Sequence, residues 1–468
     1  MAYIITSIRY GTSEAENTYY AASQELFSVK EFKSPSMVLS LLDDVESDFG
    51  KASPPSGAKA SQSLLLEKAS GLAERELQGI KVSGIAGLDK VTKEMEGALH
   101  GAAHLLAVKL LLSVPVVVRF HNDTDGSSGA YGLYKSISAM LKRNGIEGRS
   151  NVTWRMHGGI SYSRMDAQFD TLYANGFSSI EKPLLIIIDF GTSAESNEGI
   201  EELGDGFDII WLDHHPIEKE FKGTGLSHYI NPWNFGSDSN YTAGFLACEF
   251  ARHFSDFDVH DAEYASLIGD FSTYAKNEEK ASKLALLLEL ITSDKRVAFK
   301  TIDQNLTPLE IDSILNDEGK FNELIGYASA KMGESLDAAL QVMKAYKARN
   351  ASIYVADFKT VRGEDLNLRY PLPGRFSSKL AAKIEELEEE PFVLALHFGS
   401  IISIRQSRRL NEKLDLTKVA KAMRESLKSV SAAGGHKSAI SVKLADENSK
   451  KEALPMLISI LKKELDAI

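Results

Sequence analysis

Three short apolar runs, each followed by side chains that bind metals, constrain the fold of this 468-residue chain most strongly. The runs lie within residues 115–121, 184–189 and 208–213, and each of these ranges ends in a histidine or an aspartate. Apolar runs of this length are typical of strands buried in a parallel sheet. Because ligands of open α/β sheets bind outside the carboxyl ends of the strands, we expect the three ends to meet in one site.

The order of the predicted elements indicates the fold class. From residue 114 onward, strand-like runs alternate with helix-like patterns, which predicts right-handed βαβ units and an α/β fold with a mainly parallel, doubly wound sheet. The pattern after the first strand predicts a helix at residues 127–141. A smaller α/β domain is expected after a helical connection, with a glycine turn at residues 433–436. The predicted divisions are an N-terminal extension of unknown role, a catalytic domain, a helical connecting segment and the smaller domain, at residues 1–92, 93–294, 295–350 and 351–468.

Composition limits the class of protein. With 43% hydrophobic and 25% charged residues the chain has ordinary globular composition, and no apolar run reaches the length of a membrane span. The single Cys248 excludes an internal disulfide and lies in an apolar helical pattern, so we expect a buried thiol and a cytoplasmic protein. The net charge of −12 argues against indiscriminate nucleic-acid binding, although residues 391–450 carry 11 Lys and Arg against 5 Asp and Glu.

The residues at the strand ends predict a two-metal centre. Alternate residues of a strand face the same way, so His121 and Asp123 share a face, and Asp125 follows in a turn. Further candidate ligands follow the neighbouring strands or end an apolar helical stretch, namely Asp189, Asp213, His214, His215 and Asp270. Mixed imidazole and carboxylate ligands suit Mn²⁺ better than an all-oxygen Mg²⁺ site. Two such ions stabilise the attacking and leaving oxygens of a phosphoryl displacement, so we predict phosphoester hydrolysis.

Each of these residues also has a simpler explanation when it is taken alone. An aspartate at a strand end is commonly a helix cap or a turn residue, and two adjacent histidines are more often structural than metal-binding. His157, which precedes two glycines, is expected to be a loop histidine. The metal site is favoured because so many acids and histidines gather at the ends of elements within one predicted domain.

The motifs together resemble the DHH phosphoesterase superfamily, and within it the archaeal branch of the RecJ-like single-strand exonucleases. Four motifs appear in the family's order, at residues 123–126, 186–191, 213–215 and 268–270. Residues 231–236 are similar to archaeal sequences between the third and fourth motifs. The second domain resembles the DHH-associated domain through residues 403–405 and through Gly434-Gly435-His436, so that the resemblance covers about residues 100–468.

The resemblance implies roles for single residues. One ion would be held by His121, Asp123 and Asp189, and the other by Asp125, Asp189, His214 and Asp270, with Asp189 bridging the two. Asp213 would orient His214, and His215 would contact the scissile phosphate. These seven acids and histidines after His121 form the predicted catalytic set: Asp123, Asp125, Asp189, Asp213, His214, His215 and Asp270.

The resemblance also implies a nucleic-acid surface on the second domain. Arg405 and His436 would bind phosphates across the interdomain cleft, helped by the backbone N–H groups of Gly434 and Gly435. Further phosphate contacts are expected from Arg408, Arg409 and Lys437.

The sequence departs from the family pattern at three places. Arg119 stands where many members have the first-motif histidine, residues 437–441 lack the usual glycine, and residues 1–92 have no counterpart.

Three functions remain open. The leading one is a Mn²⁺- or Mg²⁺-dependent exonuclease on single-stranded DNA or RNA, in DNA repair or replication. The second is a phosphodiesterase of oligoribonucleotides or other small nucleotides. The third is a weakly active replisome protein, since archaeal relatives bind the GINS complex; this chain, however, keeps all five motif acids.

Overall fold

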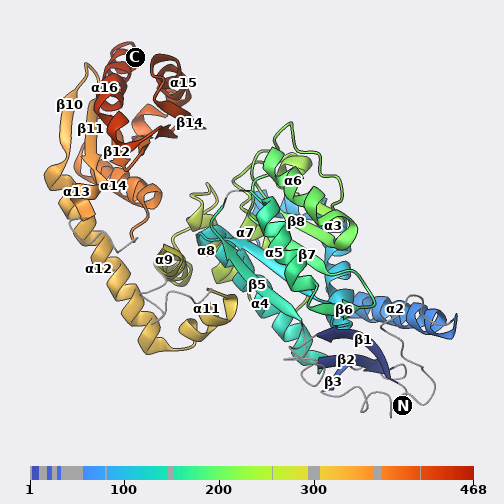
Figure 1. The fold of residues 1–468 in the computed structure, drawn as a ribbon. Coiled ribbons are helices and arrows are strands. Elements are labelled where there is room, and N and C mark those ends of the chain that lie inside the picture. Colours follow the sequence, from blue (N-terminus) through green and yellow to red (C-terminus); the bar gives the residue numbers. More distant parts are fainter. Residues whose placement is uncertain are drawn as a thin grey trace. The chain divides into compact units, whose positions relative to one another are not determined.

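The computed structural model resolves the chain into helices and strands that alternate over most of its length (Figure 1). The structure describes residues 3–9, 18–23, 29–32, 56–79, 82–145, 151–159, 161–255, 257–293, 306–362, 370–411 and 413–468. The chain forms two compact units, of which the first holds residues 1–295 and 299–321 and the second holds residues 296–298 and 322–468. The predicted four-part division of the chain remains a prediction.

A five-stranded parallel sheet forms the centre of the first unit. Its strand order is β5-β4-β7-β8-β9, and every neighbouring pair is parallel. The strands are β4 (Val116–His121), β5 (Val152–His157), β7 (Leu184–Ile188), β8 (Asp208–Leu212) and β9 (His228–Ile230). Because β4, β7 and β8 are neighbours, their carboxyl ends lie at one edge of the sheet.

Helices cover both faces of this sheet. Apolar residues of the two faces alternate along each strand, as Val116 and Val118 on one side and Val117 on the other show, and each set joins a separate core. The first core includes helices α2 (Ser56–Glu76), α3 (Ala86–Leu111), α4 (Thr124–Arg143), α7 (Ala243–Ala251) and α8 (His260–Gly269). The second includes α5 (Arg164–Ala174) and α6 (Ala194–Leu203). The doubly wound arrangement is therefore confirmed.

The N-terminal strands form a second sheet of the first unit. β1 (Tyr3–Arg9), β2 (Thr18–Ser23) and β3 (Val29–Phe32) pair in an antiparallel manner. β1 also pairs with β6 (Phe177–Ser179), which lies far along the chain. The N-terminal residues are thereby tied to the main α/β region by backbone hydrogen bonds.

Helices at the end of the first unit lead to the second. They are α9 (Glu279–Ser293), α11 (Pro308–Leu315) and α12 (Glu318–Val342). No helix among the described residues is both long and apolar enough to cross a membrane. Cys248 is buried in α7, as its apolar surroundings predict.

The second unit is built on a mixed six-stranded sheet of order β10-β11-β12-β13-β15-β14. Its strands are β10 (Lys344–Lys347), β11 (Ser352–Asp357), β12 (Phe392–Phe398), β13 (Ile401–Gln406), β14 (Val430–His436) and β15 (Ala439–Leu444). Its helices are α13 (Phe358–Arg362), α14 (Pro373–Leu387), α15 (Leu416–Ser426) and α16 (Lys450–Asp466). The smaller α/β domain is thus confirmed as a fold.

Two local expectations are wrong. The helix expected at residues 127–141 begins at Thr124, because the carboxylate of Asp123 accepts from the N–H of Gly126 and caps it. Asp125 therefore lies in the first turn of α4 rather than in a loop. Gly434 and Gly435, expected in a turn, lie in strand β14, where they pair with Ser441 and Ile440 of β15.

Candidate metal centre

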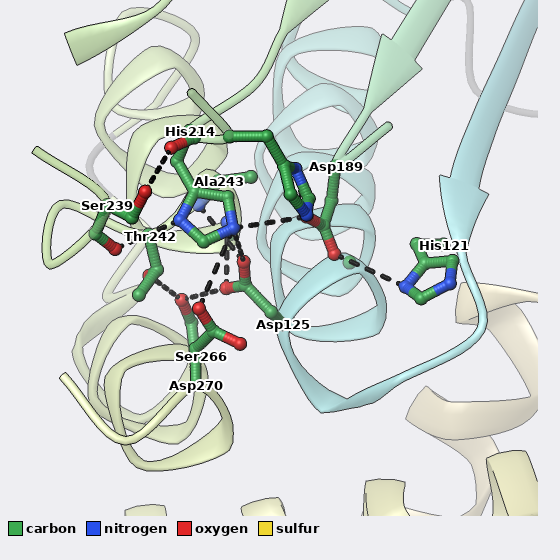
Figure 2. Close-up of polar contacts among 12 residues, drawn as sticks. His121, Asp125, Asp189, His214, Ser239, Thr242, Ala243, Ser266 and Asp270 are labelled. Atoms are coloured by element: carbon green, nitrogen blue, oxygen red, sulfur yellow. Dashed lines mark hydrogen bonds and ion pairs between the residues drawn. The ribbon is translucent and has the colours of Figure 1, made fainter. Parts of the chain in front are cut away.

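Six side chains converge where β4, β7 and β8 end, and we call them the ligand cluster. Figure 2 shows five of them, His121, Asp125, Asp189, His214 and Asp270, around a common centre. Asp123 lies two residues after the last residue of β4, and its Oδ2 lies 2.9 Å from His121 Nδ1. The cluster therefore consists of His121, Asp123, Asp125, Asp189, His214 and Asp270. These are the six residues predicted from the sequence to hold metal.

The carboxylate of Asp125 is held at the N-terminus of helix α7. The backbone N–H groups of Ala243 and Gly244 each donate to it at 3.0 Å, and the Ser266 hydroxyl donates as well. A helix N-terminus attracts negative charge, which suits a buried carboxylate. A side chain at position 244 would collide with the Asp125 carbonyl oxygen, so only glycine allows helices α4 and α7 to approach this closely.

His214 directs one ring nitrogen toward three acids. Its Nδ1 lies 3.0 Å from the Ser239 carbonyl oxygen, to which it donates, and this leaves Nε2 with a lone pair. Nε2 lies 3.4 Å from Asp189, 3.6 Å from Asp270 and 3.7 Å from Asp125. A backbone carbonyl that fixes the tautomer in this way is a usual support of a metal-binding imidazole.

Asp189 lies between two groups of possible ligand atoms. It follows β7 with a φ of 64°, in the left-handed region that non-glycine residues rarely adopt. Its Oδ2 is buried without a hydrogen-bond partner, which is costly unless a cation compensates. Possible ligand atoms form three sets, and within each set the atoms lie no more than 4.8 Å apart. The sets are His121-Asp123-Asp189, Asp125-His214-Asp270 and Asp189-His214-His215.

The electrostatics of the cluster fit a divalent cation. Burial and the neighbouring Asp189 raise the pKa of Asp125 well above its usual value. Burial opposes ionisation of Asp189 too, but the neighbouring imidazoles of His121 and His214, at 3.6 and 3.4 Å, hold its pKa well below the usual value. Burial alone would lower the pKa of His121, yet Asp123 and Asp189 raise it to about 11. The raised pKa values of Asp125 and His121 mean that protons on these side chains balance the charge of the crowded carboxylates. A bound divalent cation would balance the same charge.

The role predicted for Asp213 is wrong. Asp213 does not orient His214; its Oδ1 lies 2.8 Å from His215 Nδ1 and also accepts from the His215 backbone N–H at 3.2 Å. The reason is the two-residue spacing, which brings His215 rather than His214 back over the Asp213 carboxylate. Burial alone would lower the pKa of His215, but Asp213 raises it. The His215 side chain is 45% exposed, so its remaining nitrogen is accessible.

Four charged residues next to the ligand cluster form a separate arginine cluster, made of Arg119, Arg155, Asp166 and Asp170. Arg119 binds Asp170 through two nitrogens at 2.6 and 3.0 Å and Asp166 at 2.9 Å. Arg155 lies 3.4 Å from Asp170. The side chain of Arg119 is therefore bound to the acids of α5 and is not part of the ligand cluster. Its role is to hold α5 against β4.

The predicted nucleic-acid residues of the second unit lie around one three-strand segment. Arg405 of β13 pairs with Ala439 of β15, which in turn pairs with His436 of β14. Arg405 has no carboxylate partner among the described residues, and burial lowers its pKa. Gly435 has a φ of 138°, and a side chain there would collide with the Ala439 carbonyl oxygen. A half-buried guanidinium without an acid is suited to a phosphate.

Other predicted phosphate contacts are arranged differently. Arg408 is exposed, its backbone N–H donates to Glu385 at 2.7 Å, and its Nε lies 3.7 Å from the same carboxylate. Arg409 donates to the Glu388 carbonyl oxygen at 2.9 Å. Lys437 is exposed and follows β14. Exposed cations paired in this way contribute little on their own.

Sequence reasoning missed Asn231 and Ser239, which hydrogen-bond to residues 213–215 and hold them in place. Buried Asn231 donates to Asp213 Oδ2 and to the His215 carbonyl oxygen at 3.4 and 3.0 Å. Ser239 accepts from His214 through its carbonyl and donates to the His214 carbonyl oxygen through its hydroxyl. The Asn-Pro pair at residues 231–232 marked a turn, but nothing in the sequence indicated these long-range partners.

Comparison with known proteins agrees with the geometry. Residues 115–268 match the model of the DHH family, N-terminal domain. An uncharacterized protein of Methanocaldococcus jannaschii is 26% identical over 214 residues, which cover 43% of this chain and 28% of that protein. The chain thus matches less than a third of the length of this curated relative.

One solved structure shares the fold of this chain. A DHH-domain structure, described as coming from a member of a family of ribosomal proteins, has a TM-score of 0.69 and 20% identity, and the match covers 88% of this chain and 99% of that one. The Mn²⁺ complex of RecJ from Thermus thermophilus has a TM-score of 0.45 and 14% identity, over 87% of this chain and 59% of that one. Residues 115–268 are thus similar to the DHH family's N-terminal domain, and side chains at this site are able to hold metal.

Proposed function

We propose that this protein is a two-metal phosphodiesterase that acts as an exonuclease on single-stranded DNA or RNA. The observation that carries the proposal is the position of Asp189, which belongs to two sets of possible ligand atoms and whose Oδ2 is buried without a hydrogen bond. His121, Asp123 and Asp189 would hold one ion, and Asp125, Asp189, His214 and Asp270 the other. Mn²⁺ is favoured over Mg²⁺ because imidazoles take part in both groups.

The chain's own residues prepare the site for phosphoryl transfer. Two divalent ions, when bound, stabilise negative charge on the attacking and leaving oxygens. Asp213 fixes the ring of His215 through Nδ1 and favours its protonated form, which leaves Nε2–H free to donate. We assign this Nε2–H to the scissile phosphate, where it donates a charge-assisted hydrogen bond to a phosphoryl oxygen.

The second unit would bind backbone phosphates of the substrate. Arg405 is proposed to pair with a phosphate, since burial disfavours its charge and no carboxylate among the described residues relieves it. His436 and the backbone N–H groups of Gly434 and Gly435 are proposed to contact the same backbone. Arg408 and Lys437 are assigned weaker contacts, because both are exposed. Binding to the GINS complex remains a prediction of the family resemblance.

The test is metal-dependent digestion of end-labelled single strands of graded length, with Mn²⁺ or Mg²⁺. Processive shortening of long strands, abolished in Asp189→Ala and Asp125→Ala, is the expected result, and the labelled end gives the polarity. The matched control is Glu202→Gln, which also removes a carboxylate charge but lies on the exposed face of α6 and outside the ligand cluster. This variant should digest like the wild type.

The other outcomes separate the alternatives. Digestion confined to di- and trinucleotides would replace the exonuclease by a small-nucleotide phosphodiesterase. The absence of metal-dependent activity on every strand would contradict the proposal and favour a binding role.

A further inference from the structure

Two exposed aromatic side chains lie beside the ligand cluster and belong to neither group of ligands. Trp233 is 43% exposed and Phe271 is 50% exposed. Among the phenylalanines and tryptophans that the structure describes, Phe169 on α5 is the other exposed ring. Two of these three rings are therefore attached to one site. Exposed aromatic surface grouped at a site is typical of ligand contact.

Trp233 is fixed to the third motif by its polar edge. Its indole Nε1 donates to the His214 carbonyl oxygen at 3.1 Å and to the Ser239 hydroxyl at 3.3 Å. Its backbone N–H donates to the side chain of Asn231 at 3.0 Å, and Asn231 also binds the His215 carbonyl oxygen. Because the N–H group is already bonded within the protein, the surface that Trp233 still exposes is ring carbon.

Phe271 is attached to the same loop from the other direction. It directly follows Asp270 with a φ of 53°, in the left-handed region that is rare for bulky residues. The residues after it are held by Asn240, which accepts from the Ser272 hydroxyl at 2.6 Å and from the Thr273 backbone N–H at 2.9 Å.

The loop at residues 239–240 therefore connects both rings to the metal centre. It bonds the Trp233 indole, the His214 imidazole and the segment after Phe271. His214, whose carbonyl oxygen binds Trp233, and Asp270, which precedes Phe271, are both predicted ligands. Their atoms Nε2 and Oδ2 lie 3.6 Å apart. A substrate phosphate at these ligands would place the group attached to it within reach of the rings.

We propose that Trp233 and Phe271 stack against nucleobases of the substrate, so that the site selects phosphodiesters that carry an unpaired base. This inference rests on the proposed phosphodiesterase function and adds a substrate requirement to it. Every base has a π-face, so such stacking recognises a single strand without reading its sequence. A base inside a duplex is stacked on its neighbours, which also accounts for a preference for single strands.

The experiment measures binding without turnover. A hexathymidylate with phosphorothioate linkages and an abasic strand of the same length and linkages are titrated into the full chain with Ca²⁺, by calorimetry. The wild type is expected to bind the base-bearing strand about tenfold or more tightly than the abasic strand, as stacking on aromatic side chains predicts. The tryptophan emission should change with the base-bearing strand only.

Matched variants separate stacking from support of the loop. Trp233→Phe and Trp233→Leu both remove the indole N–H, but only Trp233→Leu removes the aromatic face. Trp233→Leu and Phe271→Leu should each lose about fivefold or more in affinity for the base-bearing strand and leave the abasic strand unchanged. Trp233→Phe should keep most of the preference. Phe169→Leu removes an exposed ring elsewhere and should behave like the wild type.

Each outcome decides the inference. Equal binding of both strands by the wild type, or equal losses in Trp233→Phe and Trp233→Leu on both strands, would overturn it. Preference for bases without hydrolysis of any strand would retain the stacking site and reject the phosphodiesterase. Hydrolysis that ignores the bases would do the reverse.

Discussion

The arginine cluster and the ligand cluster are neighbours near the ends of β4 and β5. They differ in whether cationic side chains of the cluster balance the charge of its carboxylates. In the arginine cluster two guanidiniums face two carboxylates, and Arg119 binds both acids at 3.0 Å or less. The ligand cluster gathers four aspartates around two histidines and leaves Asp189 Oδ2 buried without a hydrogen bond. The carboxylates of the arginine cluster are balanced by arginines of the chain. Those of the ligand cluster would be balanced by a bound cation.

Two histidines show the same difference on a smaller scale. His121 and His157 are partners in the register of β4 and β5, and both rings contact Phe190. Asp123 and Asp189 raise the pKa of His121 against the effect of burial. Burial lowers the pKa of His157, although Asp166 lies 3.2 Å away, because Arg119 and His121 oppose its protonation. Asp166 raises the pKa of His157, but burial and the positive charges of Arg119 and His121 outweigh this effect.

The largest effect is expected from removing the bridging acid. Asp189→Ala deprives both ion sites of a ligand, so metal-dependent hydrolysis should fall about 10³-fold or more, at or beyond the upper end of the loss from one oxyanion-hole donor. Steady-state digestion of a labelled strand measures this loss. Circular dichroism should show an intact fold, and residual activity within about tenfold of the wild type would contradict the two-metal site.

Breaking the arginine cluster should instead reduce stability. Asp170→Asn leaves Arg119 buried without its bidentate partner and should lower the free energy of unfolding by about 3 kcal/mol, because an uncompensated buried charge is costly. Denaturant unfolding measures it. Arg119→Met in the same background should recover part of the loss. The exposed Glu202→Gln should change the free energy by less than about 0.5 kcal/mol.

Metal binding should distinguish the clusters in the folded protein. At a Mn²⁺ concentration about 100 times its Kd, the wild type should gain about 2.7 kcal/mol of unfolding free energy by linkage, and EDTA should remove the gain. Asp170→Asn, although less stable, should keep this gain, whereas Asp189→Ala should lose it. Thermal unfolding with and without Mn²⁺ tests both variants. An equal gain in Asp189→Ala would place the metal elsewhere.

The ligand cluster could be predicted from the sequence because its signals are local. An apolar run that ends in an acid or a histidine marks both a strand and the edge where it ends, and β4, β7 and β8 each carry this signal. Parallel topology then brings the ends together. The same signal does not reveal that Asp189 takes a left-handed backbone or that its Oδ2 is buried without a hydrogen bond.

The missed features depend on partners far apart in the chain or on an exception to a local rule. In the sequence, Arg119 is a charged residue within an apolar strand, and only the packing of α5 shows its acids at residues 166 and 170. Ser239 binds His214 across 25 residues, which no local pattern encodes. Adjacent glycines usually indicate a turn, but Gly434 and Gly435 here pair with β15, which approaches Gly435 too closely for a side chain.

The smallest expected effect is the opposite titration of the two paired histidines in the metal-free protein. His121 should stay protonated up to about pH 11, so its contribution to stability is complete below its unfolded pKa of about 6.5 and is lost as pH rises toward 11. His157, whose pKa is lowered, contributes stability above about pH 6.5 that is lost as pH falls. Imidazole nitrogen shifts in NMR report both. Replacing His157 by glutamine should flatten the loss of stability between about pH 7 and 5, and a parallel titration of the two rings would show that their carboxylate surroundings do not differ.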